Sequence, residues 1–195
     1  DAGIINPDEN LGYVGLSWQK DASWGDYHVT TLTDYGETVN LVNAMTYSDN
    51  IYFAREALKI GADTMEEKLK SFGFEEELPF DLTMQASTFD DDGKIDSEIQ
   101  LADTGYGQGQ VLVNPLHLLS MYSMFVNDGN MIQPVLKYEE NAAAKIWKEQ
   151  AVSAQTAQTV KQSLLSVIEN PSGTGASAKI DGVTMLGKTG TAEIK

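Results

Sequence analysis

The sequence predicts an α-rich α/β fold, in which a helical subdomain is combined with an incomplete sheet. Apolar residues recur at helical spacing in about five segments, whereas only two or three short segments favour strands. The chain has 195 residues, 42% of them hydrophobic, so it can bury a core of ordinary composition. We expect one partial domain with an irregular segment at 1–38, a mainly helical subdomain at 39–180 and a strand at 181–195.

The boundaries of the first helices are marked by capping residues. The first forty residues are rich in glycine, aspartate and aromatic side chains, which favours loops and short strands. Asn40 then caps a first helix, and Gly61 ends a second one. For the third helix, Asp63 is the expected cap, with Glu66 three residues later and Gly73 at the end.

The segment from Asn114 to Gly129 predicts a buried central helix. Asn114 is its cap, and Pro115 takes the first helical position, where a missing N–H costs nothing. Apolar residues nearly encircle this segment, so we expect it at the centre of the fold. Residues 131–138 follow as a short edge strand, because Pro134 cannot donate to a β-ladder.

A long amphipathic helix and a strand are expected in the last part of the chain. The helix covers residues 153–170 and ends before Pro171, and a flexible loop at 170–182 leads to the predicted strand. The apolar stripe of the helix consists of Ala157, Val160, Leu164, Val167 and Ile168.

The composition excludes several classes of function. A formal net charge of −16 argues against a nucleic-acid partner, because such partners require a basic face. The acidic runs at 75–77 and 90–92 are interpreted as solvated surface. The chain has no cysteine and no apolar run long enough to span a membrane, and we expect no signal peptide within it. His28 and His117 lie far apart without ligand spacing, so we predict no metal and no cofactor, and we interpret His117 as a core residue.

One nucleotide-binding motif matches in residue types but not in its surroundings. Gly182–Thr189 reads GVTMLGKT, which fits the phosphate-binding loop. Such a loop follows a core strand and opens a helix, whereas a polar loop precedes this segment and β-favouring residues follow Thr189. We therefore keep a nucleotide-binding domain only as a lesser alternative.

The segment from Thr88 to Ile99 resembles a calcium loop in part. Its third, fifth and ninth positions are acidic, and Gly93 occupies the sixth. The first and twelfth positions lack the aspartate and glutamate that anchor the ion, so we interpret this segment as a polar surface turn.

Two tripeptides together indicate a different chemistry. Ser48-Asp49-Asn50 on its own favours a helix cap. With Lys188-Thr189-Gly190 downstream, however, it forms two of the three motifs of penicillin-binding proteins and serine β-lactamases. The stretches SDNIYFAREALKIGA, LADTGYGQGQVLVNPLHLLSMYS, GKTGTAEIK and WQKDASWGDYHVT extend the similarity to nearly the whole chain. The sequence thus resembles the transpeptidase domain of class B penicillin-binding proteins, in particular the low-affinity, resistance-associated Gram-positive group.

This resemblance implies a β-lactamase/transpeptidase-like fold and a peptidoglycan D,D-transpeptidase that acts on D-Ala-D-Ala stem peptides. It implies that Lys188 supplies positive charge and holds the hydroxyl of Ser48, which relays a proton to the leaving group. Asn50 is expected to bond the substrate amide and to steady the catalytic lysine. The hydroxyls of Thr189 and Thr191 are expected to hold the substrate carboxylate, the N–H of Thr191 to form half of the oxyanion hole, and Gly190 to leave room for the substrate.

The third motif of the family, Ser-x-x-Lys, is matched only by Ser17-Trp-Gln-Lys20, which lacks an apolar helical context and lies only 31 residues before Ser48. We therefore expect a chain that begins after the true nucleophile, ends within the Lys188 strand and is inert by itself.

The parent protein is expected to be membrane-anchored elsewhere, extracytoplasmic and acylated by β-lactams. A catalytically silent β-lactam sensor is the alternative. The exposed strand is expected to pair with a second copy or to be poorly ordered. Gly107-Gln108-Gly109, with Asn114-Pro115, is interpreted as a structural turn.

Overall fold

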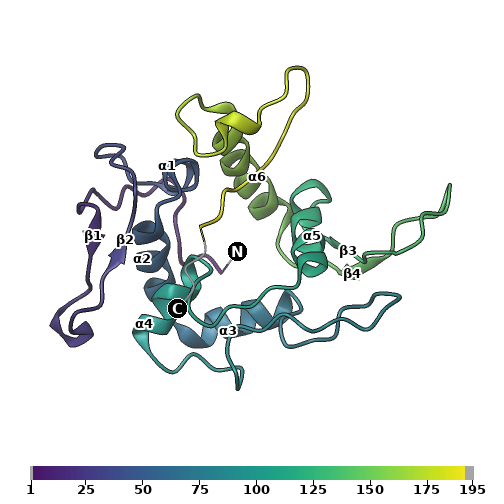
Figure 1. Ribbon diagram of the computed structural model, residues 1–195, viewed down its shortest axis with the longest axis horizontal. Coiled ribbons are helices and arrows are strands. Elements are labelled where there is room, and N and C mark those ends of the chain that lie inside the picture. Colours follow the sequence, from purple (N-terminus) through teal and green to yellow (C-terminus); the bar gives the residue numbers. More distant parts are fainter. Residues whose placement is uncertain (1, 192–195) are drawn as a thin grey trace. The chain divides into compact units, whose positions relative to one another are not determined.

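The computed structural model describes residues 2–191, which form two compact units. One unit contains residues 63–95 and 110–160, and the other contains residues 2–62, 96–109 and 161–191. The helices are α1 (Leu41–Tyr47), α2 (Asn50–Ile60), α3 (Ala62–Ser71), α4 (Glu98–Gly105), α5 (Pro115–Ser123) and α6 (Ala154–Glu169). The strands are β1 (Ser17–Trp18), β2 (Val29–Thr30), β3 (Met131–Ile132) and β4 (Ile146–Lys148), and Figure 1 shows their course. Helices thus predominate over two small sheets, as predicted.

The unit that contains α2 and α4 is held together by a core of aromatic and small residues. β1 and β2 pair antiparallel, with Trp18 opposite Val29. One buried cluster of this core consists of Trp24, Val29, Ile51, Ala54 and Ala102. The two helices approach closely at Gly105, where an added Cβ would lie 2.6 Å from Ala57 Cβ and 2.7 Å from the Phe53 carbonyl oxygen. Only glycine therefore permits this contact.

Gly105→Ala is expected to destabilise this unit by about 1–3 kcal/mol, because the new methyl group overlaps the backbone of α2. Urea unfolding measures the change in the free energy of unfolding. Gly190→Ala is the matched control, since a Cβ there has no neighbour within 4 Å and is expected to leave stability unchanged. Equal stability of the two variants would contradict the close contact.

The structure differs from the expected helices at α3 and at α4. α3 begins at Ala62, so Asp63 lies in its first turn instead of capping it, and Glu66 accepts a hydrogen bond from the Ile95 N–H at 2.8 Å. The helix resumes directly after Gly61, which leaves no place for a cap at Asp63. α4, capped by Ser97, was not expected, because its eight residues are too few for a clear apolar period.

The prediction that α5 is a helix buried on all sides is also wrong. α5 ends at Ser123 and continues as a 3₁₀ turn, and the side chains it buries are His117 and Ser120. Leu118 is 44% exposed and Leu119 is 63% exposed. In the part of the chain that the structure describes, packing covers only one side of the helix, and apolar composition alone does not show which side is covered.

His117 fills the core of the unit that contains α5, as predicted. Its Nε2 donates to the Phe72 carbonyl oxygen at 2.8 Å, and its Nδ1 lies 2.7 Å from the Ser87 hydroxyl. The Asn114 N–H donates to the same hydroxyl oxygen, which leaves the hydroxyl hydrogen for Nδ1. Burial, partly offset by the Phe72 carbonyl and Glu76, lowers the pKa of His117.

Acidification is expected to destabilise this unit before its carboxylates titrate. The pKa of His117 in the folded chain lies below the unfolded value of about 6.5. At a pH between these two pKa values, the unfolded chain therefore binds a proton at this residue, whereas the folded chain leaves the imidazole neutral. The free energy of unfolding should therefore fall as the pH drops from about 6.5, by at most about 1.4 kcal/mol per pH unit. Urea unfolding between pH 7 and 5 tests this. The slope should flatten in His117→Gln, and an unchanged slope would refute the assignment.

The C-terminal segment differs from the predicted strand. Residues 183–191 join no β-ladder, and residues 192–195, which the prediction also covered, lie outside the described residues. A strand requires a neighbour for its N–H and C=O groups, and residues 2–191 supply none beside this segment. Pairing with a second copy stays a prediction. Nor does any helix within residues 2–191 have the length and hydropathy needed to cross a bilayer.

Candidate active site

The junction between α1 and α2 presents two side chains to a pocket. Asp49 is the N-cap of α2: one carboxylate oxygen accepts the Ile51 N–H at 2.9 Å, and the other accepts the Tyr35 hydroxyl at 2.5 Å. Asp49 is buried. The cap interpretation of the Ser-Asp-Asn motif thus holds for its middle residue, and the side chains of Ser48 and Asn50 line the pocket on either side of it.

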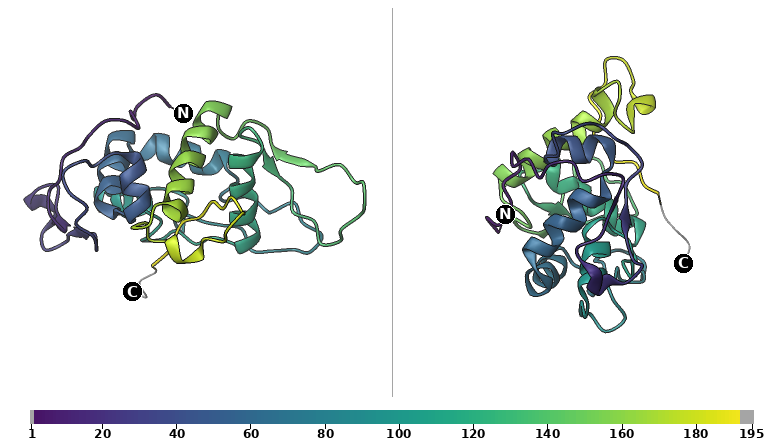
Figure 2. Two further views of the ribbon diagram at one scale, coloured as in Figure 1. Left: turned by 90° about the horizontal axis from the view of Figure 1, so that it is seen from above. Right: turned by 90° about the vertical axis from the view of Figure 1, so that its left-hand side faces the viewer.

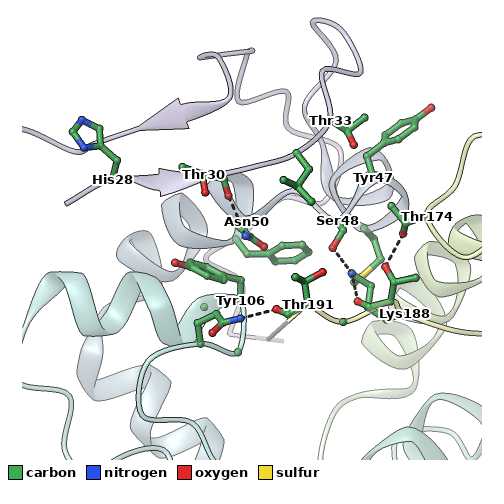
Figure 3. Close-up of a pocket in the computed structure, with 18 of the residues that line it drawn as sticks. His28, Thr30, Thr33, Tyr47, Ser48, Asn50, Tyr106, Thr174, Lys188 and Thr191 are labelled. Atoms are coloured by element: carbon green, nitrogen blue, oxygen red, sulfur yellow. Dashed lines mark hydrogen bonds between the residues drawn. The ribbon is translucent and has the colours of Figure 1, made fainter. Parts of the chain in front are cut away.

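Ser48 adopts a left-handed conformation, which aims its hydroxyl at a lysine. It ends α1 with φ 58° and ψ 53°, a region that costs a residue other than glycine roughly 1–2 kcal/mol. Lys188 Nζ donates to Ser48 Oγ at 2.6 Å and to the Thr189 carbonyl oxygen at 2.8 Å (Figure 3). The two residues are 140 positions apart in sequence. Burial lowers the pKa of Lys188, so this ammonium releases a proton more easily than an exposed lysine.

The loop after α6 carries Lys188 back to the pocket. It leaves the end of the helix and returns beside it, where the Gly187 N–H bonds to the Leu164 carbonyl at 3.4 Å (Figure 2). Gly187 allows this approach, because a Cβ there would lie 3.0 Å from Ile168 Cδ1. Thr174 links the loop to the end of α1 through its N–H, which donates to the Thr46 carbonyl at 3.0 Å. The segment is therefore placed by α6 and α1.

Two more hydrogen bonds connect the motif residues to their surroundings. Asn50 Nδ2 donates to the Thr30 carbonyl on β2 at 3.0 Å, which anchors the amide beside the strand. The hydroxyl of Thr189 donates to the hydroxyl of Thr174 at 2.9 Å. Both bonds join residues that line the pocket (Figure 3).

The pocket has a volume of about 850 Å³ and a distinctive charge. Among the described residues that line it, Lys188 is the one lysine or arginine, and no carboxylate contributes. In a chain with a net charge of −16, this makes the pocket locally attractive to an anion. The predicted site residues all line it: Ser48, Asn50, Lys188, Thr189, Gly190 and Thr191.

The pocket also contains Tyr27 and Tyr106, which the motif analysis did not single out, and Gln108, which it interpreted as part of a structural turn. Both tyrosine hydroxyls donate to one carboxylate oxygen of Asp103, which is buried in α4, and the two hydroxyls are 3.2 Å apart. Burial first, and then the bond to Asp103, raises the pKa of Tyr106, which keeps its hydroxyl protonated. Tyr27 and Tyr106 lie in the sequence stretches that carry the family resemblance. That resemblance was the signal that could have indicated these two residues from the sequence.

Ser17 lies away from this site. It is exposed on β1, and Lys20 forms an ion pair with Glu98. Neither Ser17 nor Lys20 lines the pocket. The arrangement agrees with the interpretation that SWQK is not the nucleophile motif.

The sequence of this chain is similar to the sequences of known proteins. Residues 1–195 match the model of the penicillin binding protein transpeptidase domain. Penicillin-binding protein 3 of Bacillus subtilis is 44% identical over 193 residues, which are 99% of this chain and 29% of that protein. The probable peptidoglycan D,D-transpeptidase PbpC of Pseudomonas aeruginosa is 28% identical over 156 residues, which are 80% of this chain and 27% of that protein.

A solved structure shows the same fold. The D,D-transpeptidase domain of a peptidoglycan glycosyltransferase from Eggerthella lenta aligns with a TM-score of 0.78 and 25% identity, over 98% of this chain and 50% of that one. The chain therefore spans less than a third of the length of these two relatives and half of the solved chain.

Proposed function

The chain belongs to the family of penicillin-binding protein transpeptidase domains, and on this premise we propose that the full-length protein is a serine D,D-transpeptidase of peptidoglycan. The observation that carries the proposal is the contact of Lys188 Nζ with Ser48 Oγ inside a pocket without carboxylates. Substrates of this class end in a D-alanine carboxylate, an anion that such a pocket attracts. The same proposal implies that the full-length protein acts on peptidoglycan at the extracytoplasmic face of the cell membrane and reacts there with β-lactams.

Ser48 and Lys188 are suited to proton transfer. Lys188 donates to Ser48 Oγ, so the hydroxyl hydrogen of Ser48 is available for a second partner. When a serine nucleophile attacks the carbonyl of the penultimate D-alanine, its hydroxyl proton passes to the base beside it, the new ester bond forms, and the bond to the terminal D-alanine nitrogen breaks. That nitrogen takes the proton of Ser48, which is replaced from Lys188. The lowered pKa of Lys188 favours this second transfer.

The remaining motif residues are proposed to bind the substrate. Thr189 and Thr191 are exposed at the pocket, where their hydroxyls can hold the terminal carboxylate. Thr189 exchanges its present partner Thr174 for the ligand. The Thr191 N–H stabilises the oxyanion, and Asn50 bonds the substrate amide from its place beside β2. Gly190 keeps the segment free of side chain where the peptide lies.

The nucleophile is proposed to lie outside these 195 residues. The single Ser-x-x-Lys in the chain, at Ser17–Lys20, is not on a helix and does not line the pocket. In the family such a motif places the serine and its lysine together. The full-length protein therefore supplies the attacking hydroxyl, and the chain described here supplies the proton relay and carboxylate site.

The test is release of D-alanine by the purified full-length protein from a synthetic stem pentapeptide that ends in D-Ala-D-Ala, together with detection of the cross-linked dimer. Both products are expected, and prior incubation with excess penicillin should abolish both. Acylation by penicillin without D-alanine release or cross-linking would instead identify a β-lactam sensor. The absence of both acylation and release would refute the proposal.

A further inference from the structure

We propose that Gln108 is a positioning residue, which holds Thr191 in place for the reaction. The inference rests on the proposed function and adds a residue to its site. Gln108 Nε2 donates to the carbonyl oxygen of Thr191 at 2.7 Å, and this contact is the dashed line that ends at Thr191 in Figure 3. The bond connects the loop after α4 with the segment that carries the Lys-Thr-Gly motif.

The segment beyond Lys188 has few other attachments. It joins no β-ladder, and Thr189 is attached through its side chain to Thr174. Among residues 2–191, Gln108 is the one residue that donates a hydrogen bond to the backbone of Gly190 or Thr191. The position of Thr191 therefore depends on Gln108 more than on any ladder.

The backbone of Gln108 is held in a tight turn against α4. Gly107 and Gly109 have φ values of 78° and 71°, which produce a tight turn with Gln108 at its centre. The Gln108 N–H donates to the Asp103 carbonyl at 2.9 Å, at the end of α4. A Cβ at Gly109 would lie 3.1 Å from Asp103 Cβ, so the turn rests directly on the helix. The backbone of Gln108 is thus fixed against α4, and its carboxamide bonds to Thr191.

The expected effect follows from the role of Thr191. Its N–H is the proposed oxyanion donor, and its carbonyl belongs to the same residue, so holding the carbonyl restrains the donor. Loss of one oxyanion donor typically costs about 10²–10³ in rate. A misplacement of about 1 Å can cost about 10². Removal of the Gln108 bond loosens the donor without deleting it, and we expect a loss of about tenfold in the rate of acylation.

The experiment uses the full-length protein and a chromogenic cephalosporin, whose ring opening is followed by stopped flow. A concentration series separates the dissociation constant of the first complex from the rate constant of acylation. Gln108→Met removes the donor at similar length, and Gln108→Glu replaces it with an acceptor. Both should lower the rate constant about tenfold, with a change of less than about threefold in the dissociation constant and an unchanged melting temperature. Gln133→Met is the matched control and should behave like the wild type, since Gln133 lies outside this pocket.

Each other result overturns the inference. Unchanged rate constants in both variants would show that Thr191 needs no support. Faster acylation would show that Gln108 covers a carbonyl that the ligand needs, so that it obstructs the site. A loss confined to the dissociation constant would indicate a binding role only. Failure of the wild-type protein to be acylated would count against the proposed function and is thereby distinguishable.

Discussion

The 195-residue chain, incubated with a fluorescent penicillin, is expected to show no covalent label after denaturing electrophoresis. Acylation requires a serine activated by an adjacent base. The one serine that touches a lysine amine in the described pocket is Ser48, to which the family resemblance gives proton relay instead of attack. Loss of the nucleophile in a serine hydrolase costs about six orders of magnitude in rate. Even overnight incubation should therefore leave the chain unlabelled.

The controls for this result separate two explanations. The full-length protein, treated in the same way, should label stoichiometrically, which shows that the reagent and conditions are adequate. A stoichiometric label on the 195-residue chain would contradict our view of where the nucleophile lies. If Ser17→Ala then removed that label, the nucleophile would be Ser17, and SWQK would be the functional motif despite its position on β1.

Replacement of Lys188 by alanine in the full-length protein is expected to reduce β-lactam acylation by about 10²–10⁴-fold, the usual contribution of a general acid or base. The variant loses both the positive charge of the pocket and the partner of Ser48. Stopped-flow acylation by a chromogenic cephalosporin measures the change. Ser48→Ala should give a loss in the same range, because it interrupts the same proton path.

The double variant shows whether the two residues act as a unit. If they do, Lys188→Ala with Ser48→Ala should be hardly slower than either single variant, since effects within one relay are not additive. Lys179→Ala is a suitable control, because Lys179 forms an ion pair with Glu169 at 2.6 Å and does not line the pocket. Losses that multiply in the double variant would show that Ser48 and Lys188 act separately.

Local signals in the sequence predicted much of the helical structure. Asn40 caps α1 and Asn114 caps α5, as expected, since a side-chain oxygen satisfies N–H groups that the helix leaves unpaired. Gly61 ends α2. These features depend on a few neighbouring residues and can be read without the fold. The short helix α4 was missed, because eight residues contain barely two apolar repeats.

The surroundings of the helices were harder to predict. The apolar residues of α5 suggested burial on all sides, whereas Leu119 is 63% exposed and the polar His117 is buried. Which face of a helix is covered depends on elements distant in sequence. The same reason explains why Gln108 seemed only structural, since its partner Thr191 lies 83 positions later.

The sequence by itself determined the chemistry available to this protein: a Ser-Asp-Asn and a Lys-Thr-Gly motif, no cysteine, and an acidic charge that disfavours nucleic acid. The family that these motifs indicated is the one to which the chain belongs. Only the tertiary structure decided that Lys188 reaches Ser48 at 2.6 Å and that Gln108 contacts Thr191. The physical reason is range. Caps and turns depend on residues within one helical turn, whereas a site is assembled by packing that returns distant segments to one place.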